Sequence, residues 1–93
     1  MTHINKGNPF PLGSSITSKG VNFSLIATNA EYVEILLFED EDSNSPKSIL
    51  KLDQNHNTGP YWHAEIKNLN AGCIYAFRVK QKNNEINNNY EKK

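Results

Sequence analysis

Three kinds of side chain in this sequence could carry chemistry: histidine, cysteine and carboxylate. His3, His56 and His63 lack the spacing that is typical of metal ligands. Cys73 is the only cysteine and has no partner in a nucleophile–base pattern, so we expect a small, partly buried side chain there. No GxSxG elbow, phosphate-binding loop or GxGxxG pattern occurs. The sequence therefore predicts no catalytic residue and no cofactor.

The carboxylates cluster in one segment, residues 39–46, which begins Glu39-Asp40-Glu41-Asp42. Oxygen ligands at alternating positions are a feature of calcium-binding loops. This segment lacks the central glycine and the distal glutamate of an EF-hand, and no helix is predicted on either side of it. We therefore predict a solvated connection between two strands and no metal site.

Aromatic rings are the remaining candidates, because tyrosine and tryptophan can stack on the apolar C–H faces of sugar rings. Tyr61 and Trp62 are candidates for carbohydrate binding, with His63 and nearby asparagines as polar contacts. The alternative for Trp62 is a core position, because Ala64 and Ile66 share its side of the strand and large aromatics dominate small cores. We favour the core position for Trp62, which makes Tyr61 the better stacking candidate.

Composition limits the class of partner. The 93 residues suffice for one domain, and the formal net charge is zero, which removes the electrostatic basis for a nucleic-acid or anionic-membrane partner. No apolar run approaches the length of a membrane span, and the first residues lack the apolar core of a signal peptide. A single cysteine fits a reducing compartment, so we expect a cytoplasmic location, or a plastid in a eukaryote.

Short alternating segments predict strands and no convincing helix. The predicted strands are 14–17, 21–27, 32–38, 48–52, 61–66 and 75–79. Turn signals at this spacing predict an all-β, immunoglobulin-like or fibronectin-like antiparallel β-sandwich. We expect an extended lead-in over 1–13, with Phe10 and Leu12 tucked onto the sandwich, a sandwich over 14–80, and an Asn/Lys-rich linker or disordered tail over 81–93.

Several residues have specific predicted positions. In 21–27 the odd-numbered residues face the core, whereas Asn22 and Ser24 face solvent. Gly20 ends a tight turn and is available for positive φ. Tyr75 lies where a loop becomes a strand, which indicates a tyrosine corner with its ring inward and its hydroxyl on a backbone group.

The strand over 32–38 is apolar on both sides. Residues 33, 35 and 37 form its core side, and the other side carries Tyr32, Leu36 and Phe38. Such a strand is expected to be covered on both faces, here by a loop or by another domain. Tyr32, Leu36 and Phe38 are therefore a candidate domain-docking face.

Five stretches in order resemble the N-terminal region of isoamylase-type debranching enzymes of glycoside hydrolase family 13. They are G-N-P-F-P-L-G at 7–13, G-V-N-F-S-L at 20–25, N-A-E-Y-V-E-I-L-L-F at 29–38, W-H at 62–63 and L-N-A-G-C-I-Y-A-F-R-V at 69–79. The resemblance implies an immunoglobulin-like domain of the family 48 carbohydrate-binding module type, which precedes a (β/α)₈ barrel. The barrel of such enzymes hydrolyses α-1,6 branch linkages in glycogen or starch and holds the catalytic carboxylates.

The function implied by the resemblance is a non-catalytic accessory domain that packs on its own catalytic barrel and helps to form the substrate groove. Two alternatives remain open. One is an autonomous α-glucan-binding module, and the other is a fibronectin-like protein-interaction domain. We expect the chain to be a fragment cut at a domain boundary, with residues 81–93 leading toward the barrel.

Overall fold

The computed structural model describes residues 4–70 and 72–82, so the predicted tail over 83–93 lies outside the described residues. The elements in chain order are β1 (Ile4–Asn5), β2 (Gly13–Ile16), β3 (Gly20–Ile26), β4 (Ala30–Phe38), β5 (Ser48–Leu52), the single 3₁₀ turn η1 (Gln54–His56), β6 (Asn57–Thr58), β7 (Tyr61–Lys67) and β8 (Ile74–Gln81). Within this described part, no helix is long and apolar enough to cross a membrane.

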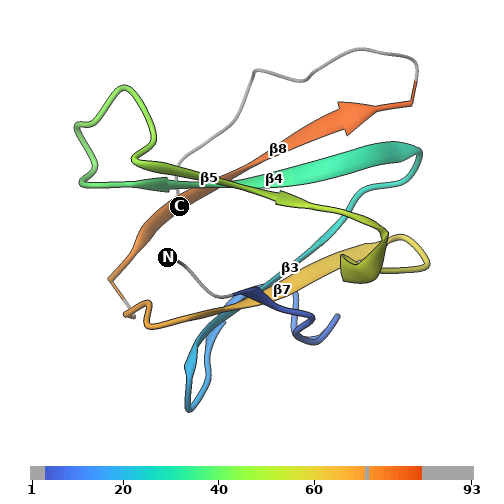
Figure 1. The fold of residues 1–93 in the computed structure, drawn as a ribbon, viewed down its shortest axis with the longest axis horizontal. Helices are drawn as coiled ribbons and strands as arrows, with labels where there is room; N and C mark the ends of the chain where they lie inside the picture. The colour runs from blue at the N-terminus through green and yellow to red at the C-terminus, as the bar shows by residue number, and fades with distance from the viewer. Residues whose placement is uncertain (1–3, 71, 83–93) are drawn as a thin grey trace.

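Two antiparallel sheets lie face to face (Figure 1). The five-stranded sheet has the order β1-β7-β3-β2, with β6 also paired to β7. The three-stranded sheet has the order β5-β4-β8. The predicted antiparallel β-sandwich is confirmed, because alternating apolar residues of both sheets face one another.

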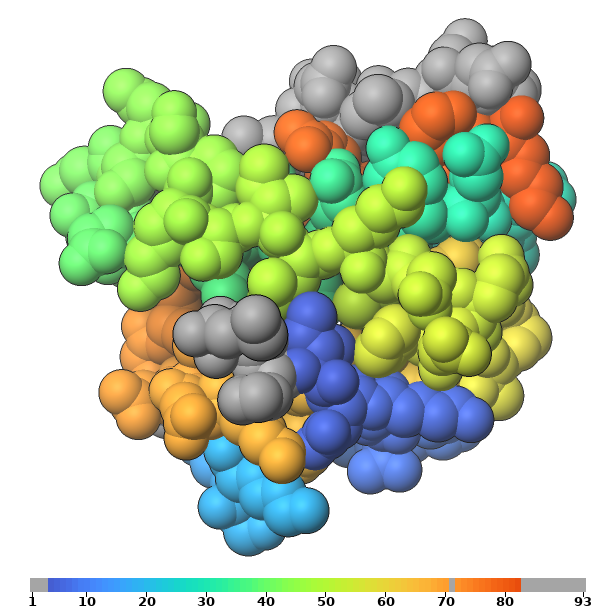
Figure 2. Space-filling view, in the orientation of Figure 1, coloured from blue at the N-terminus to red at the C-terminus, as the bar shows by residue number. Residues whose placement is uncertain are grey.

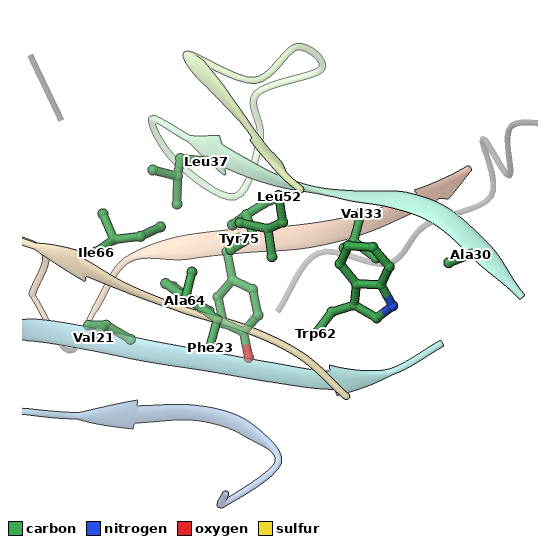
Figure 3. Close-up of a cluster of buried hydrophobic side chains, with 11 residues drawn as sticks. Val21, Phe23, Ala30, Val33, Leu37, Leu52, Trp62, Ala64, Ile66 and Tyr75 are labelled. Carbon is green, nitrogen blue, oxygen red and sulfur yellow. The ribbon is translucent and has the colours of Figure 1, made fainter. Parts of the chain in front are cut away.

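The core lies between the two sheets (Figure 3). Its fully buried residues include Phe23, Val33, Ile35, Leu52 and Ile66. These residues sit at alternate positions of β3, β4, β5 and β7, because successive side chains of a strand point to opposite faces. The odd-numbered residues of β3 are thus core-facing, as the alternation predicted.

Tyr75 points its ring into the core, as predicted. The ring packs edge-on against Phe23 at 4.8 Å and against Phe77 at 5.4 Å between centroids. The predicted contact of its hydroxyl with a backbone group stays a prediction, because residue 71 of the preceding loop lies outside the described residues. Within the described part, Tyr75 stabilises the fold through aromatic packing.

Asn22 and Ser24 are buried, which corrects the prediction that they face solvent. The amide of Asn22 makes two bonds with the backbone of Asn8: its Oδ1 accepts from the N–H at 2.8 Å, and its Nδ2 donates to the carbonyl at 3.0 Å. The hydroxyl of Ser24 donates to the carbonyl of Pro9 at 2.6 Å. The side of β3 away from the core is thus covered by the chain that precedes β2 (Figure 1, blue).

The N-terminal segment belongs to the sandwich more closely than an extended lead-in would. β1 pairs with β7, with Ile4 opposite Ile66 and Asn5 opposite Glu65. Gly20 also differs from expectation, because a Cβ there would collide with the carbonyl oxygen of Ile66. Close approach of β3 to β7, rather than a positive φ, therefore requires this glycine.

Candidate functional site

The three candidate sugar-binding residues lie on both faces of β7. Trp62 is 2% exposed, belongs to the core, and donates its Nε1–H to the carbonyl of Ala27 at 3.3 Å. Tyr61 and His63 point to the opposite side, away from the three-stranded sheet. Trp62 thus takes the core position that the strand pattern favoured, and it presents no ring face to a ligand.

His63 is 1% exposed and both of its ring nitrogens are engaged. Nδ1 lies 2.8 Å from the carbonyl of Lys6, and Nε2 lies 2.8 Å from the hydroxyl of Thr58. Because a carbonyl can only accept, Nδ1 carries a proton and donates it to Lys6, while Nε2 and the Thr58 hydroxyl share a second hydrogen bond. His63 therefore joins the N-terminal segment and β6 to β7, and its ring is not available to a ligand.

Tyr61 is half-buried and contacts an aromatic ring from the N-terminal segment. The centroids of Phe10 and Tyr61 lie 4.9 Å apart, and the ring planes are tilted by 60°. Phe10 is 62% exposed, and Leu12 and Ile26 are 51% and 52% exposed. Phe10 thus rests its ring on β7, as expected, but Phe10 and Leu12 both stay more than half exposed, which corrects the expectation that they tuck onto the sandwich. We call Phe10, Leu12, Ile26 and Tyr61 the aromatic platform.

Sequence reasoning missed Phe10 as a candidate. The signal that could have found it is the pair of prolines around it, which force an extended chain and leave an aromatic side chain without a helical or strand face to pack on. Only the structure places this ring beside Tyr61, since the two residues are about fifty positions apart in the chain.

The three residues of the candidate docking face differ in their exposure to solvent. Leu36 and Phe38 are buried in a cluster with Ala76 and Ile74 on the outer side of the three-stranded sheet. Tyr32 is half-buried, and the Nζ of Lys51 lies 4.2 Å from the centre of its ring. Docking through this face stays a prediction, with Tyr32 as its most accessible member.

The acidic segment between β4 and β5 makes turn contacts. The carboxylate of Asp40 accepts from the backbone N–H of Asp42 at 2.9 Å and from the hydroxyl of Ser43 at 3.1 Å. Glu39 and Lys47 lie 3.8 Å apart, and both are largely exposed. Among the residues that the structure describes, no group of three or more His, Cys, Asp or Glu is gathered as a metal site.

Two ionisable groups have a displaced pKa. The amide of Asn5 donates to the Glu65 carboxylate at 3.1 Å and holds the pKa of that carboxyl below its usual range. Burial raises the pKa of the Cys73 thiol. Because the thiolate is the reactive form, a raised pKa lowers the nucleophilicity of Cys73, whose side chain is partly buried, as expected.

Comparison with known proteins shows a consistent set of relatives. The family model of carbohydrate-binding module 48 (isoamylase N-terminal domain) matches residues 11–92. A glycogen debranching enzyme of Enterobacter sp. (strain 638) is 37% identical over 79 residues, which cover 85% of this chain and 11% of that protein. A glycogen operon protein GlgX homolog of Mycobacterium bovis is 37% identical over 73 residues, which cover 78% of this chain and 9% of that protein.

Solved structures of a pullulanase from Paenibacillus barengoltzii share the fold. The apo form superposes with a TM-score of 0.67 at 21% identity, covering 94% of this chain and 12% of that one. The complex with maltohexaose and alpha-cyclodextrin gives a TM-score of 0.67 at 20% identity, covering 91% and 12%. The chain therefore spans about a tenth of the length of the relatives that it matches.

Proposed function

We propose the following function for this chain, which belongs to the carbohydrate-binding module 48 (isoamylase N-terminal domain) family. It acts as a non-catalytic N-terminal accessory domain of a debranching enzyme that hydrolyses α-1,6 linkages in glycogen or starch. The domain packs on the catalytic (β/α)₈ barrel of the same protein and helps to form the substrate groove. The protein works in the cytoplasm, which the free Cys73 supports.

The proposal rests on the share of each chain that the alignment covers. The glycogen debranching enzyme of Enterobacter aligns with 85% of this chain, yet the aligned part is only 11% of that enzyme. A match that uses nearly all of one chain and a small part of the other is what an accessory domain produces. The 37% identity over that length supports a common role more strongly than the shared fold does.

The outer side of the three-stranded sheet supports packing against a neighbouring domain. Along β4 and β8, the cross-strand pairs change from charged to apolar, from Glu34 opposite Arg78 to Leu36 opposite Ala76. Tyr32 and the half-exposed Ile49 lie on this same side. Leu36 and Ala76 are themselves fully buried, so Tyr32 and Ile49 are the apolar side chains of this face that a neighbouring domain would contact.

The test is the activity of the full-length protein on a branched glucan. We expect it to release linear chains from β-limit dextrin, measured as new reducing ends, and to leave unbranched amylose intact. Removal of residues 1–82 should lower kcat/KM on β-limit dextrin. A full-length protein without activity on any α-1,6-branched glucan would refute the proposed function.

An autonomous α-glucan-binding module is the second candidate, and the aromatic platform favours it. An accessory domain whose only role was to pack on a barrel would not need the exposed ring of Phe10 beside the other sheet. The two functions are compatible in one domain, because the platform and the candidate docking face belong to different sheets.

A further inference from the structure

We propose that the edge of β8 is the docking site for one extended segment of the same debranching enzyme, which adds as a fourth strand to the three-stranded sheet. The inward side chains of this added strand are apolar, and its outward side chains include carboxylates. The assignment rests on the proposed function and deepens it, because it names the contact through which the domain joins the rest of the enzyme.

The two edges of the three-stranded sheet have different surroundings. β5 forms one edge and contacts β7 of the opposite sheet. Figure 2 shows the yellow-green atoms of β5 above the blue atoms of the N-terminal segment. β8 forms the other edge, and among residues 4–70 and 72–82 it pairs with β4 alone. Alternate N–H and C=O groups along Ile74–Gln81 therefore point away from the sheet, as on any edge strand.

The core is covered less completely along β8 than along β4. Val33 and Ile35 of β4 are fully buried, whereas their partners across the β4–β8 pair, Val79 and Phe77, are only half-buried. Paired residues of neighbouring strands point to the same side, so all four face the core. Because β4 covers one flank of Phe77 and Val79, their remaining exposure lies at the edge. A strand beside β8 would cover these two side chains.

The opposite sheet extends one strand beyond β8. The rings of Phe23 on β3 and Tyr75 on β8 point toward one another with centroids 4.8 Å apart, so β8 lies across from β3 (Figure 3). β2 is the strand next to β3. Its Ile16 pairs with Val21 and so shares the core side of the sheet, yet it is 70% exposed. A strand added to β8 would lie across from β2 and cover this side of it.

The charges on β8 select the chemistry of the added strand. Arg78 and Lys80 lie on the outward side of β8. Their carboxylate partners, Glu34 at 2.7 Å and Glu31 at 3.7 Å, both belong to β4 and therefore lie on the flank away from the edge. Opposite charges on neighbouring strands attract, and like charges repel. Carboxylates on the outward side of the added strand therefore match this edge.

The same charges argue against a second copy of the chain as the partner. Two β8 strands paired edge to edge would bring Arg78 and Lys80 of one copy beside the same cations of the other. The aligned part of the Enterobacter enzyme is 11% of that protein, so most of such a protein lies outside the aligned region. A segment of the same molecule also binds at a high effective concentration, which favours it over a separate protein.

The experiment compares amide hydrogen exchange of this 93-residue chain with that of the full-length protein. In the full-length protein, the edge amides of β8 should exchange more slowly by at least about tenfold, because the added strand accepts their hydrogen bonds. The amides of β5, the other edge strand, should exchange alike in both proteins. Contact through outward side chains alone would not produce this difference between the two edges.

Two variants test the contacts of the added strand. Ile16→Ala should leave the urea midpoint of the 93-residue chain unchanged, because Ile16 is exposed there, but should speed exchange at β8 in the full-length protein by about threefold or more. The matched control, Ile26→Ala, alters another exposed isoleucine and should have no effect. Lys80→Glu should also speed exchange at β8, and Lys6→Glu, at an exposed position of the N-terminal segment, should not.

Four results would overturn the proposal. They are equal exchange of the β8 amides in the two proteins, equal slowing at β5 and β8, no effect of Ile16→Ala or Lys80→Glu in the full-length protein, and slowing at β8 that appears in the 93-residue chain as its concentration rises. The last result would indicate pairing between copies. The debranching assay measures hydrolysis independently of these amides, so failure of the edge contact is distinguishable from failure of the proposed function.

Discussion

Both outer faces of this sandwich bury side chains, although the sequence suggests burial for only one of them. The outer side of the five-stranded sheet carries Asn22, Ser24 and His63, which read as polar and solvated, yet all three are buried. The outer side of the three-stranded sheet carries Leu36 and Phe38, and they form a small buried cluster of their own. The comparison shows that alternation along a strand identifies a face, but only the rest of the chain determines what covers it.

The two coverings also differ in their chemistry. On the five-stranded sheet the covering segment is held by directional hydrogen bonds, and its own apolar side chains, Phe10 and Leu12, point outward. On the three-stranded sheet the burial is apolar, and the ion pair between Arg78 and Glu34, at 2.7 Å, borders it. The segment that covers the five-stranded sheet therefore exposes its apolar side chains to solvent. The outer side of the three-stranded sheet buries its apolar side chains.

Truncation of Leu36 should have the largest effect. Leu36→Ala removes a fully buried side chain next to Ala76, and we expect it to lower the free energy of unfolding by about 3 kcal/mol. Urea unfolding followed by Trp62 fluorescence measures this loss. The control is Ile49→Ala, which lies opposite Leu36 on β5 but is 48% exposed, and should lose less than about 1 kcal/mol. Equal losses would mean that the outer cluster is not a buried unit.

Removal of the Asn22 amide should cause the second-largest loss of stability. Asn22→Ala takes away both hydrogen bonds to the backbone of Asn8, and we expect a loss of about 2 kcal/mol. Hydrogen exchange should also show faster exchange of the Asn8 amide, because its acceptor is gone. Asn55→Ala, at an exposed position, is the control and should have no effect. If the Asn8 amide kept its protection, the covering segment would be held by something other than Asn22.

The hydrogen bond between Asn5 of β1 and Glu65 of β7 should make the free energy of unfolding depend on pH. Because Asn5 and other contacts lower the folded-state pKa of Glu65, the stabilisation is present above the pKa of the unfolded chain and is lost as pH falls through the lowered folded pKa. Asn5→Ala should raise the Glu65 pKa toward its usual value, measured by NMR titration of the side-chain carboxyl carbon. An unchanged Glu65 pKa would show that the remaining contacts, rather than Asn5, are responsible.

The smallest loss of stability is expected when Phe10 of the aromatic platform is truncated. Phe10→Ala removes an exposed ring and should change the free energy of unfolding by less than about 0.5 kcal/mol. The same urea experiment used for Leu36 measures it. A loss of several kcal/mol would make Phe10 a structural residue and would remove the contrast between a face that presents side chains and a face that buries them.

Local pattern was sufficient for most of the elements. The strand at Ser48–Leu52 has the predicted bounds, and those at Tyr61–Lys67 and Gly20–Ile26 agree within one residue of the predicted starts and ends. The core position favoured for Trp62 and the inward ring of Tyr75 are also observed. These features follow from a period of two residues and from the size of aromatic side chains, both of which are local properties.

The candidate site could not be predicted in the same way. Phe10 meets Tyr61, and Lys6 meets His63, across about fifty residues or more of intervening chain. The alternation of residues along a strand cannot predict such a contact, because the contact depends on how the N-terminal segment crosses the sheet. The hydrogen-bonding capacity of Asn22 was visible in the sequence, but its partner, the backbone of Asn8, was not.

The sequence by itself determined the sandwich, the approximate strands and the family, since these depend on alternation, turn residues and ordered motifs that are read along the chain. Only the tertiary structure decided which outward residues are buried and which aromatic rings reach solvent. The physical reason is that burial depends on what lies across from a side chain, and hydrogen bonds from three buried polar groups place the N-terminal segment there.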